Sequence, residues 1–128
     1  MAGVVLDASA VLALIRAEPG SDRVEELIGQ GIISAVNLQE VIKELLVSGL
    51  ALEGIETILD ELRLDLRSHD RNAAYAAASL YEATKRYGRG LGDRSCMALG
   101  IALNRPVVTA DREWRNVSIE GLELLHIR

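Results

Sequence analysis

Short runs of apolar residues alternate along the chain with longer segments in which apolar residues recur every three or four positions. The short runs are "GVVLD" at 3–7, "IISA" at 32–35, "PVVTA" at 106–110 and "LELLHI" at 122–127. Strands that are buried on both faces of a sheet have such runs, because neither face requires polar side chains. We therefore predict four short strands.

The segments between these runs have the spacing of amphipathic helices. In "NLQEVIKELLVSG", for example, Leu38, Val41, Ile42, Leu45 and Leu46 fall on one side of a helix. The predicted helices span residues 8–18, 21–31, 37–49, 53–64, 71–88 and 93–105. Asp22 with Glu25 fits a capping box at the start of the second, and Asp93 would cap the last.

Strands without polar alternation that are separated by helices indicate an α/β fold. We expect a central, mainly parallel sheet of four to five strands, covered by helices on both faces as a three-layer α/β/α sandwich. The chain has 128 residues, a length typical of one domain, and no repeat or linker divides it. A single domain over residues 1–128 is therefore expected.

The composition indicates the class of protein and its cellular compartment. Apolar residues make up 49% of the chain and charged residues 26%, a globular balance. The chain has neither an apolar run near the ~20 residues of a membrane span nor the pattern of a signal peptide. The one cysteine, Cys96, excludes an intrachain disulfide, so we expect a cytoplasmic protein without membrane contact.

The net charge of −5 argues against a scaffold that binds nucleic acid through bulk positive charge. It leaves open an enzyme that handles nucleic acid locally. Seven of the 14 basic residues lie between Lys85 and Arg115.

Four carboxylates lie either just after a predicted strand or at the start of a predicted helix. Asp7 follows the first strand, and Asp111 follows "PVVTA". Glu40 lies in the first turn of the helix after "IISA", and Asp93 opens the helix that leads to "PVVTA". In open parallel sheets, ligands bind outside the carboxyl ends of the strands. The topology thus predicts that the four acids share one edge of the sheet.

Each acid taken singly also has a structural explanation. Asp7 and Asp93 could cap helices, Glu40 could close a capping box with Asn37, and Asp111 could form a turn in "TADRE". These separate explanations do not account for four acids at one edge of the sheet. Two carboxylates about 5–6 Å apart repel by roughly 3 kcal/mol at an effective dielectric of 20, so such a cluster would destabilise the fold. A divalent cation would neutralise the cluster, and oxygen ligands without His or Cys suit Mg²⁺ or Mn²⁺.

Four stretches of the chain together resemble a known family. In order they are "VVLDASAVLALI", "NLQEV", "GLGDRSCMALGIA" and "VVTADREW". Their order and approximate spacing are similar to those of a PIN domain, and closest to the VapC-like toxins of prokaryotic toxin–antitoxin pairs. The resemblance implies a PIN-like α/β sandwich with Mg²⁺- or Mn²⁺-dependent endoribonuclease activity on RNA.

The resemblance also implies roles for particular residues. Asp7, Glu40, Asp93 and Asp111 are the expected catalytic and metal-binding acids. Asp7 and Asp93 would be the main direct ligands, while Glu40 and Asp111 would act through water, a second metal site or the attacking water.

Four further residues are candidates beside these acids. Ser9 and Thr109 are expected to hydrogen-bond a carboxylate or a phosphate. Arg94 and Arg112 could hold flanking phosphates, although a solvated surface role explains them equally well.

The family further implies a homodimer and a cognate antitoxin protein as partners. Two other functions stay open. One is a noncatalytic module with a PIN-like fold that binds RNA or a protein partner, and the other is a housekeeping PIN nuclease. The four acids argue against the noncatalytic module, since basic side chains would bind RNA better than acidic ones. Cleavage of RNA that depends on Mg²⁺ or Mn²⁺ separates an enzyme from a binding module.

Overall fold

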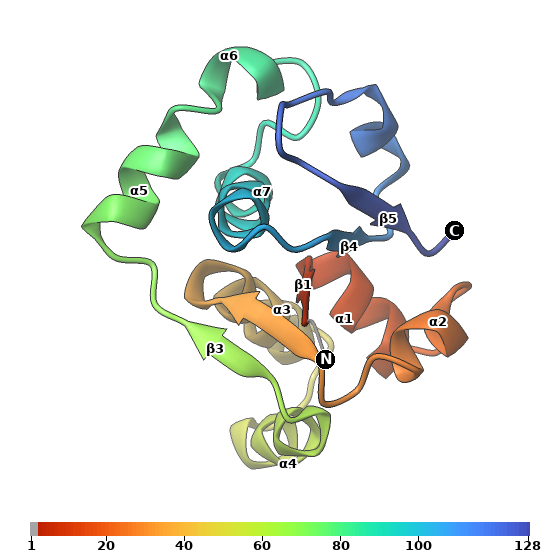
Figure 1. The fold of residues 1–128 in the computed structure, drawn as a ribbon. Coiled ribbons are helices and arrows are strands. Elements are labelled where there is room, and N and C mark those ends of the chain that lie inside the picture. Colours follow the sequence, from red (N-terminus) through yellow and green to blue (C-terminus); the bar gives the residue numbers. More distant parts are fainter. Residues whose placement is uncertain (1–2) are drawn as a thin grey trace.

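A computed structural model describes residues 3–128, which form a five-stranded, fully parallel sheet (Figure 1). The strands are β1 (Val4–Leu6), β2 (Gly31–Ser34), β3 (Asp65–Arg67), β4 (Val107–Thr109) and β5 (Leu124–His126). Their order across the sheet is β3-β2-β1-β4-β5, with every neighbouring pair parallel. The predicted α/β class and the parallel sheet are confirmed.

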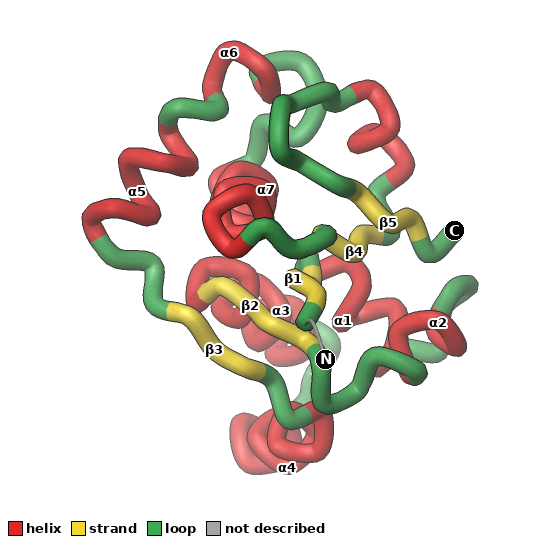
Figure 2. The backbone as a smooth tube through the Cα atoms, viewed as in Figure 1, coloured by secondary structure: helices red, strands yellow, loops and turns green. Residues whose placement is uncertain are grey.

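Helices cover both faces of the sheet, which makes the molecule a three-layer sandwich (Figure 2). One layer holds α1 (Ala8–Ile15), α2 (Ser21–Glu25), α3 (Ala35–Val47) and α4 (Leu52–Leu62). The other holds α5 (Arg71–Ala78), α6 (Tyr81–Thr84), α7 (Leu91–Leu103) and the 3-10 helix η1 (Arg112–Asn116). Within residues 3–128, no helix is both long and apolar enough to span a bilayer.

The two faces of the sheet bury separate apolar clusters, because successive side chains of a strand point to opposite faces. Val4 and Leu6 of β1 pack with the α1–α4 layer, whereas Val5 between them packs against α7. The fully buried Trp114 of η1 belongs to the α7 cluster. The short strands therefore supply both cores at once, which explains their unbroken apolar pattern.

The strand β3 is the one strand that the apolar pattern did not predict. Its residues are "DLR", with Leu66 53% exposed and Asp65 paired with Arg67. It lies at an open edge of the sheet, where charged side chains stay in water and block pairing with another chain. An edge strand of this kind carries no buried run.

The helix α3 begins two residues earlier than predicted. Ser34 is its N-cap, and the Ser34 hydroxyl accepts a hydrogen bond from the Val36 N–H at 3.2 Å. Glu40 consequently lies in the second turn and not the first, and Asn37 is a helical residue without a capping role. The capping box between Asn37 and Glu40 is wrong.

The predicted helix over 71–88 is divided into α5 and α6. At the break, the Ser79 hydroxyl donates to the Tyr75 carbonyl and the Thr84 hydroxyl donates to the Leu80 carbonyl. Such back-bonding by Ser and Thr bends or interrupts a helix. The turn buries Thr84 completely and packs Leu80 against the α7 cluster.

Two predicted helix caps also differ from the structure. Helix α2 follows Gly20, whose φ of 94° is left-handed, and within the described residues no side chain caps it, so the Asp22–Glu25 capping box is wrong. Helix α7 begins at Leu91, which places Asp93 in its first turn and not at the N-cap. Leu91 and Gly92, predicted as loop, are helical.

The chain changes direction across the sheet at β1. From β1 it proceeds to β2 and β3 on one side, and it then crosses through α5–α7 to β4 and β5 on the other. The gap between β1 and β4 is thus a topological switch point, the place where open parallel sheets bind ligands beyond the strand ends. Asp7 and Asp111 follow the two strands that flank it.

Candidate active site

Asp7 lies at the switch point and is almost completely buried, with 4% of its surface exposed. It occupies the N-cap position of α1, but its side chain makes no capping hydrogen bond to the helix. The carboxylate Oδ2 instead accepts from the Ser9 hydroxyl at 2.6 Å and from the Thr109 hydroxyl at 3.0 Å. The capping explanation for Asp7 therefore does not account for its position.

The two hydroxyls are held so that their protons point at Asp7. Ser9 Oγ accepts from the Ala110 N–H at 2.9 Å, and Thr109 Oγ1 accepts from the Asp111 N–H at 3.0 Å. Each hydroxyl carries one proton, which remains free for the carboxylate. Ser9 and Thr109 thus fasten Asp7 to the end of β4.

The pKa of the Asp7 carboxyl group is raised to about 7. Burial is the largest cause, because it disfavours the charged form, and the negative charges of Asp93 and Glu40 add to it. The hydrogen bonds from Ser9 and Thr109 partly offset the rise. The buried acid is close enough to two other acids to feel their charge.

Asp93 lies on α7, where its Oδ2 accepts the Gly90 N–H at 3.1 Å across the start of the helix. Burial raises the pKa of this half-buried carboxyl group, as do the charges of Asp111 and Glu113. The Gly90 N–H and the Arg94 charge act in the opposite direction. Asp111 is the N-cap of η1, and its Oδ1 accepts the Glu113 N–H at 3.0 Å, which confirms the predicted turn there.

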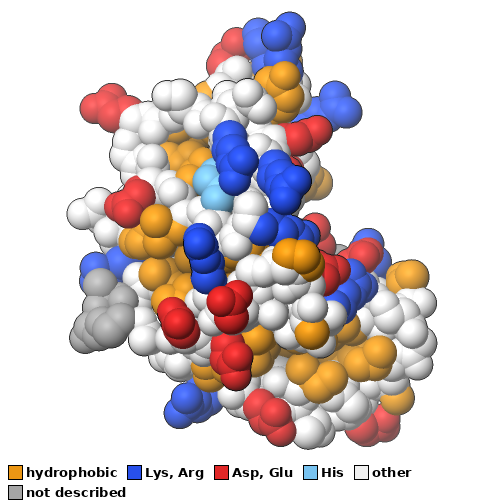
Figure 3. Space-filling model, turned by 90° about the vertical axis from the view of Figure 1, so that its right-hand side faces the viewer, with side chains coloured by type: hydrophobic (Ala, Val, Ile, Leu, Met, Phe, Trp, Pro, Cys, Tyr) orange, Lys and Arg blue, Asp and Glu red, His pale blue; other side chains and the backbone are white. Residues whose placement is uncertain are grey.

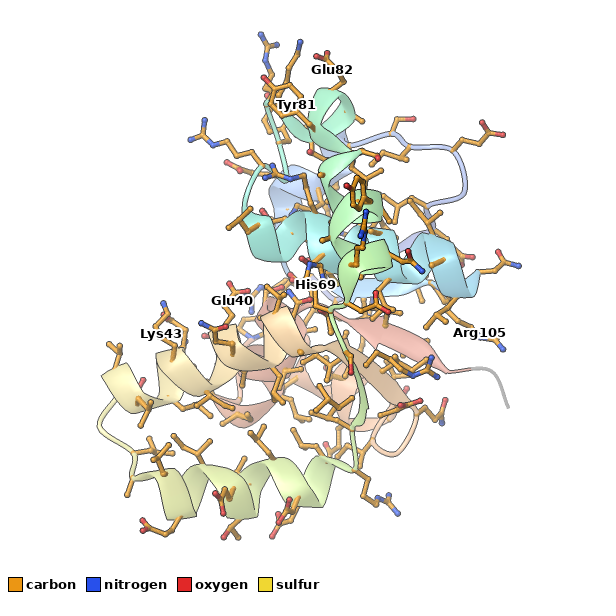
Figure 4. All side chains as sticks on the ribbon, turned by 90° about the vertical axis from the view of Figure 1, so that its left-hand side faces the viewer. Glu40, Lys43, His69, Tyr81, Glu82 and Arg105 are labelled. Atoms are coloured by element: carbon orange, nitrogen blue, oxygen red, sulfur yellow. The ribbon has the colours of Figure 1, made fainter. Side chains whose placement is uncertain are left out.

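Glu40 projects from α3 toward the start of α7 (Figure 4). Burial of its carboxyl group and the charge of Asp93 raise the pKa of Glu40. The two helices approach closely at Gly92, where an added Cβ would lie 2.8 Å from Glu40 Oε1. The absence of a side chain at Gly92 therefore leaves room for the Glu40 carboxylate between the two helices.

Asn37 holds the same two helices together, and our sequence analysis missed this. The side chain is fully buried, and its Nδ2 donates to the Gly92 carbonyl at 3.0 Å. Asn37 also lowers the pKa of Glu40 through a hydrogen bond. Its spacing of three residues from Glu40 on one helix face is the signal that could have placed it at the site.

The four predicted acids thus come from four elements and influence one another's charge. A hollow of about 500 Å³ beside them is lined by Glu40, Asp93, Lys43 and Gly90, among others. None of the four acids has an ion-pair partner within residues 3–128. The donor set is made of oxygens alone. The raised pKa values of Asp7, Glu40 and Asp93 come first from burial and then from the charges of neighbouring acids, and a hard divalent cation would offset both.

The side chains as described do not form a closed ligand cage. Among residues 3–128, no group of three or more Asp, Glu, His or Cys side chains is gathered closely enough to hold a metal ion. The chemistry of the acids fits such an ion, but direct coordination by all four would require their side chains to move.

The two candidate arginines differ in their surroundings. Arg94 donates to the Arg89 carbonyl and lies near enough to Asp93 to lower the pKa of that acid. Arg112 is exposed on η1, directly after Asp111. Each is the immediate neighbour in sequence of one of the candidate acids, Asp93 or Asp111.

Comparison with known proteins identifies similar folds. A model of the PIN domain matches residues 4–120. The DNA-bound VapBC structure from Salmonella typhimurium is similar with a TM-score of 0.73 and 21% identity, covering 100% of both chains. The structure of VapBC-1 from nontypeable Haemophilus influenzae is similar with a TM-score of 0.69 and 20% identity, covering 97% of each chain.

A toxin–antitoxin complex from Klebsiella pneumoniae is also similar, with a TM-score of 0.72 and 15% identity over 94% of this chain and 95% of that one. No curated protein matches the sequence. At these identities the solved structures establish a shared fold, while the family model covers most of the chain.

Proposed function

The chain belongs to the PIN domain family, and on that premise we propose that it is a Mg²⁺- or Mn²⁺-dependent endoribonuclease and the toxin of a toxin–antitoxin pair. Asp7, Glu40, Asp93 and Asp111 are its proposed catalytic and metal-binding residues. The proposed substrate is RNA, and we expect the protein to act in the cytoplasm. We also expect residues 1–128 to form one PIN domain.

The buried Asp7 carboxylate is the observation that carries this proposal. A buried acid without a cationic partner, next to two more acids, is costly for the fold. Structural ion pairs do not explain it, because no described residue pairs with it. A function that uses the charge, namely binding a divalent cation, does explain it.

The residues have separable tasks in such a reaction. Asp7 and Asp93 would hold the metal directly, while Glu40 and Asp111 would hold it through water or orient the attacking water. The bound ion would lower the pKa of a water and stabilise charge on the phosphoryl oxygens. Ser9 and Thr109 keep the Asp7 carboxylate in one orientation, and the Gly90 N–H does the same for Asp93. Arg94 and Arg112 would hold neighbouring phosphates.

Cleavage of cellular RNA by the purified chain tests the activity. We expect cleavage with Mg²⁺ or Mn²⁺ and none with chelator. The variants Asp7→Asn, Glu40→Gln, Asp93→Asn and Asp111→Asn should each lose at least about 100-fold in rate yet stay folded, since metal-site losses are commonly of that size.

The control for this test is Asp70→Asn, which changes an acid that caps α5 outside the site. It should cleave like the wild type. A chain that binds RNA without cleaving it under any metal would instead be the noncatalytic module.

The toxin assignment rests on a further surface. Helix α3 and the start of α4 expose Leu46, Val47 and Leu52 by 44%, 76% and 56%, and a groove of about 320 Å³ runs along Leu38 and Ile42. Apolar side chains exposed side by side mark a protein interface. The solved relatives are toxin–antitoxin complexes, so we assign this groove to the antitoxin, which would suppress cleavage, and we expect the chain to be a homodimer. A monomer that no neighbouring small protein inhibits would instead be a housekeeping nuclease.

A further inference from the structure

Arginines gather where β5, α2 and η1 meet, beside the Asp111 end of the site. We propose that this surface binds the phosphates of single-stranded RNA next to the one that is cleaved, an inference that rests on the proposed function. We refer to it as the arginine face. It consists of Arg23, Arg112, Arg115 and Arg128. Figure 3 shows several Lys and Arg side chains collected around a histidine on this side of the molecule.

Two members of the arginine face, Arg23 and Arg115, are held by main-chain oxygens of the C-terminal residues. Arg23 of α2 donates to the His126 carbonyl at 3.3 Å, and Arg115 of η1 donates to the Arg128 carbonyl at 3.0 Å. Each of these contacts uses one of the five N–H donors of a guanidinium. The remaining donors of Arg23 and Arg115 are free for a ligand.

The charges of the face are largely unneutralised. Arg128 pairs with Glu18 at 3.2 Å, but no Asp or Glu side chain within residues 3–128 forms an ion pair with Arg23, Arg112 or Arg115. His126 adds no charge near pH 7, because burial and the Arg115 charge lower its pKa. The net positive field therefore comes from arginines with open donors.

The arginine face continues directly from the acids. His126 of β5 is the register partner of Thr109 of β4, whose hydroxyl donates to Asp7. Neighbouring strands are about 4.8 Å apart, so the face begins one strand spacing beyond the end of β4. Asp111, two residues beyond this strand end, is near enough to influence the pKa of His126.

RNA is the ligand that this juxtaposition fits. A cluster of acids repels a polyanion, and a chain with a net charge of −5 offers no general attraction to it. Productive binding then requires a local positive surface within reach of the acids. Arginine supplies a planar fork that matches phosphate oxygens and keeps its charge at every physiological pH.

The test compares RNA affinities of the full-length chain in chelator, where the proposed activity is silent. A labelled single-stranded oligoribonucleotide is the probe, and fluorescence anisotropy gives the dissociation constant at several salt concentrations. Arg23→Gln with Arg115→Gln should weaken binding about fivefold per arginine at 0.1 M salt, and lower the salt slope by about 0.7 for each lost contact.

The matched control is Arg105→Gln. Arg105 is an exposed arginine that precedes β4 and therefore lies at the opposite edge of the sheet, far from Glu40 (Figure 4). Arg105→Gln removes one positive charge, as each of the two test substitutions does, and should change the affinity by less than about twofold, as expected for a distant, screened charge. Arg23→Lys with Arg115→Lys, which keeps the charge and a donor, should retain most of the affinity.

Three outcomes would overturn the inference. They are a wild-type chain that does not bind the oligoribonucleotide, an equal loss in the Arg105 variant, and unchanged binding by the double glutamine variant. In the last case the arginines would serve the C-terminal strand or a protein partner. The proposed function fails separately, since a chain that binds RNA through this face but never cleaves it would keep this inference and lose the nuclease.

Discussion

Asp7 combines two features that act against each other. The carboxyl group is 4% exposed, which disfavours its charge, and yet two hydroxyls donate to the same oxygen, which favours it. Burial and the neighbouring acids dominate, so the pKa is raised to about 7 from an ordinary value of 3.8. The group therefore titrates close to physiological pH when no metal is bound.

This shift predicts how stability changes with pH. Between about pH 4 and pH 7 the folded chain binds a proton at Asp7 that the unfolded chain has released, so the metal-free protein loses stability as pH rises. The loss would be about 4 kcal/mol at most. Urea unfolding in chelator at pH 5 and pH 8 measures the part of this loss that lies above pH 5, roughly 2.7 kcal/mol.

Asp7→Asn should remove that dependence, because the amide does not titrate. Asp70→Asn, the exposed cap of α5, should keep it. Equal slopes in the wild type and in Asp7→Asn would show that Asp7 titrates in the folded chain as it does in the unfolded one.

The sequence was informative about the acids and uninformative about what orients them. The positions of Asp7 and Asp111 were predicted correctly because each follows an apolar strand, and the carboxyl ends of parallel strands lie at the same edge of the sheet. Asn37 was misread as a helix cap, since its partner Gly92 is 55 residues away along the chain. A tertiary contact of that kind leaves no local pattern.

Among the elements, α3 and α7 form the contact on which Glu40 depends. An added Cβ on Gly92 would lie 2.8 Å from Glu40 Oε1 and 3.3 Å from Asn37 Nδ2. The Glu40 carboxylate is the flexible end of a long side chain and would be displaced. Gly92→Ala should therefore lower RNA cleavage at least about tenfold while changing the free energy of unfolding by less than about 1 kcal/mol.

Gly54→Ala is the matched control for this change. Gly54 lies inside α4 with nothing within 4 Å of an added Cβ. The alanine should stabilise the helix by roughly 0.5–1 kcal/mol and leave cleavage unchanged. If Gly92→Ala cleaves RNA as well as the wild type does, the contact between Glu40 and α7 has no part in catalysis.

Element boundaries were predicted where one physical signal dominated. The strands β1, β2 and β4 were found because their burial on both faces excludes polar residues, and β5 was found because its run is apolar although it lies at an edge with Leu125 42% exposed. The strand β3 and the break between α5 and α6 were not, since an exposed edge strand and the Ser79 and Thr84 hydroxyl bonds leave the apolar spacing unchanged. Single hydrogen bonds moved the starts of α3 and α7 by about one turn at most.

Over the whole molecule, charge is separated rather than evenly spread. The chain carries a net −5, with uncompensated acids at the switch point and an arginine face beside them. The proposed cation site and the proposed RNA-binding surface thus adjoin each other at one edge of the sheet. An enzyme that brings a phosphodiester to a metal requires both, which links the proposed activity to the proposed surface.

Metal binding should be visible as added stability of the whole fold. A cation that binds the folded chain and not the unfolded one stabilises it by about 2.7 kcal/mol at 100 times its dissociation constant. For a chain of this length we expect the melting temperature to rise by roughly 6–12 °C with Mg²⁺ or Mn²⁺. Part of this gain comes from offsetting the burial and the mutual repulsion that raise the pKa values of Asp7, Glu40 and Asp93.

The variant Asp93→Asn should lose most of the metal-induced rise, because it removes a proposed direct ligand. Its metal-free melting temperature should not fall, since the change also removes a charge that Asp7 and Glu40 repel. Asp70→Asn serves as the control, because it makes the same chemical change at the cap of α5, outside the cluster. Differential scanning fluorimetry with and without metal measures all three proteins. A metal-induced rise of equal size in both variants would place the ion elsewhere, and the assignment of the four acids would then be wrong.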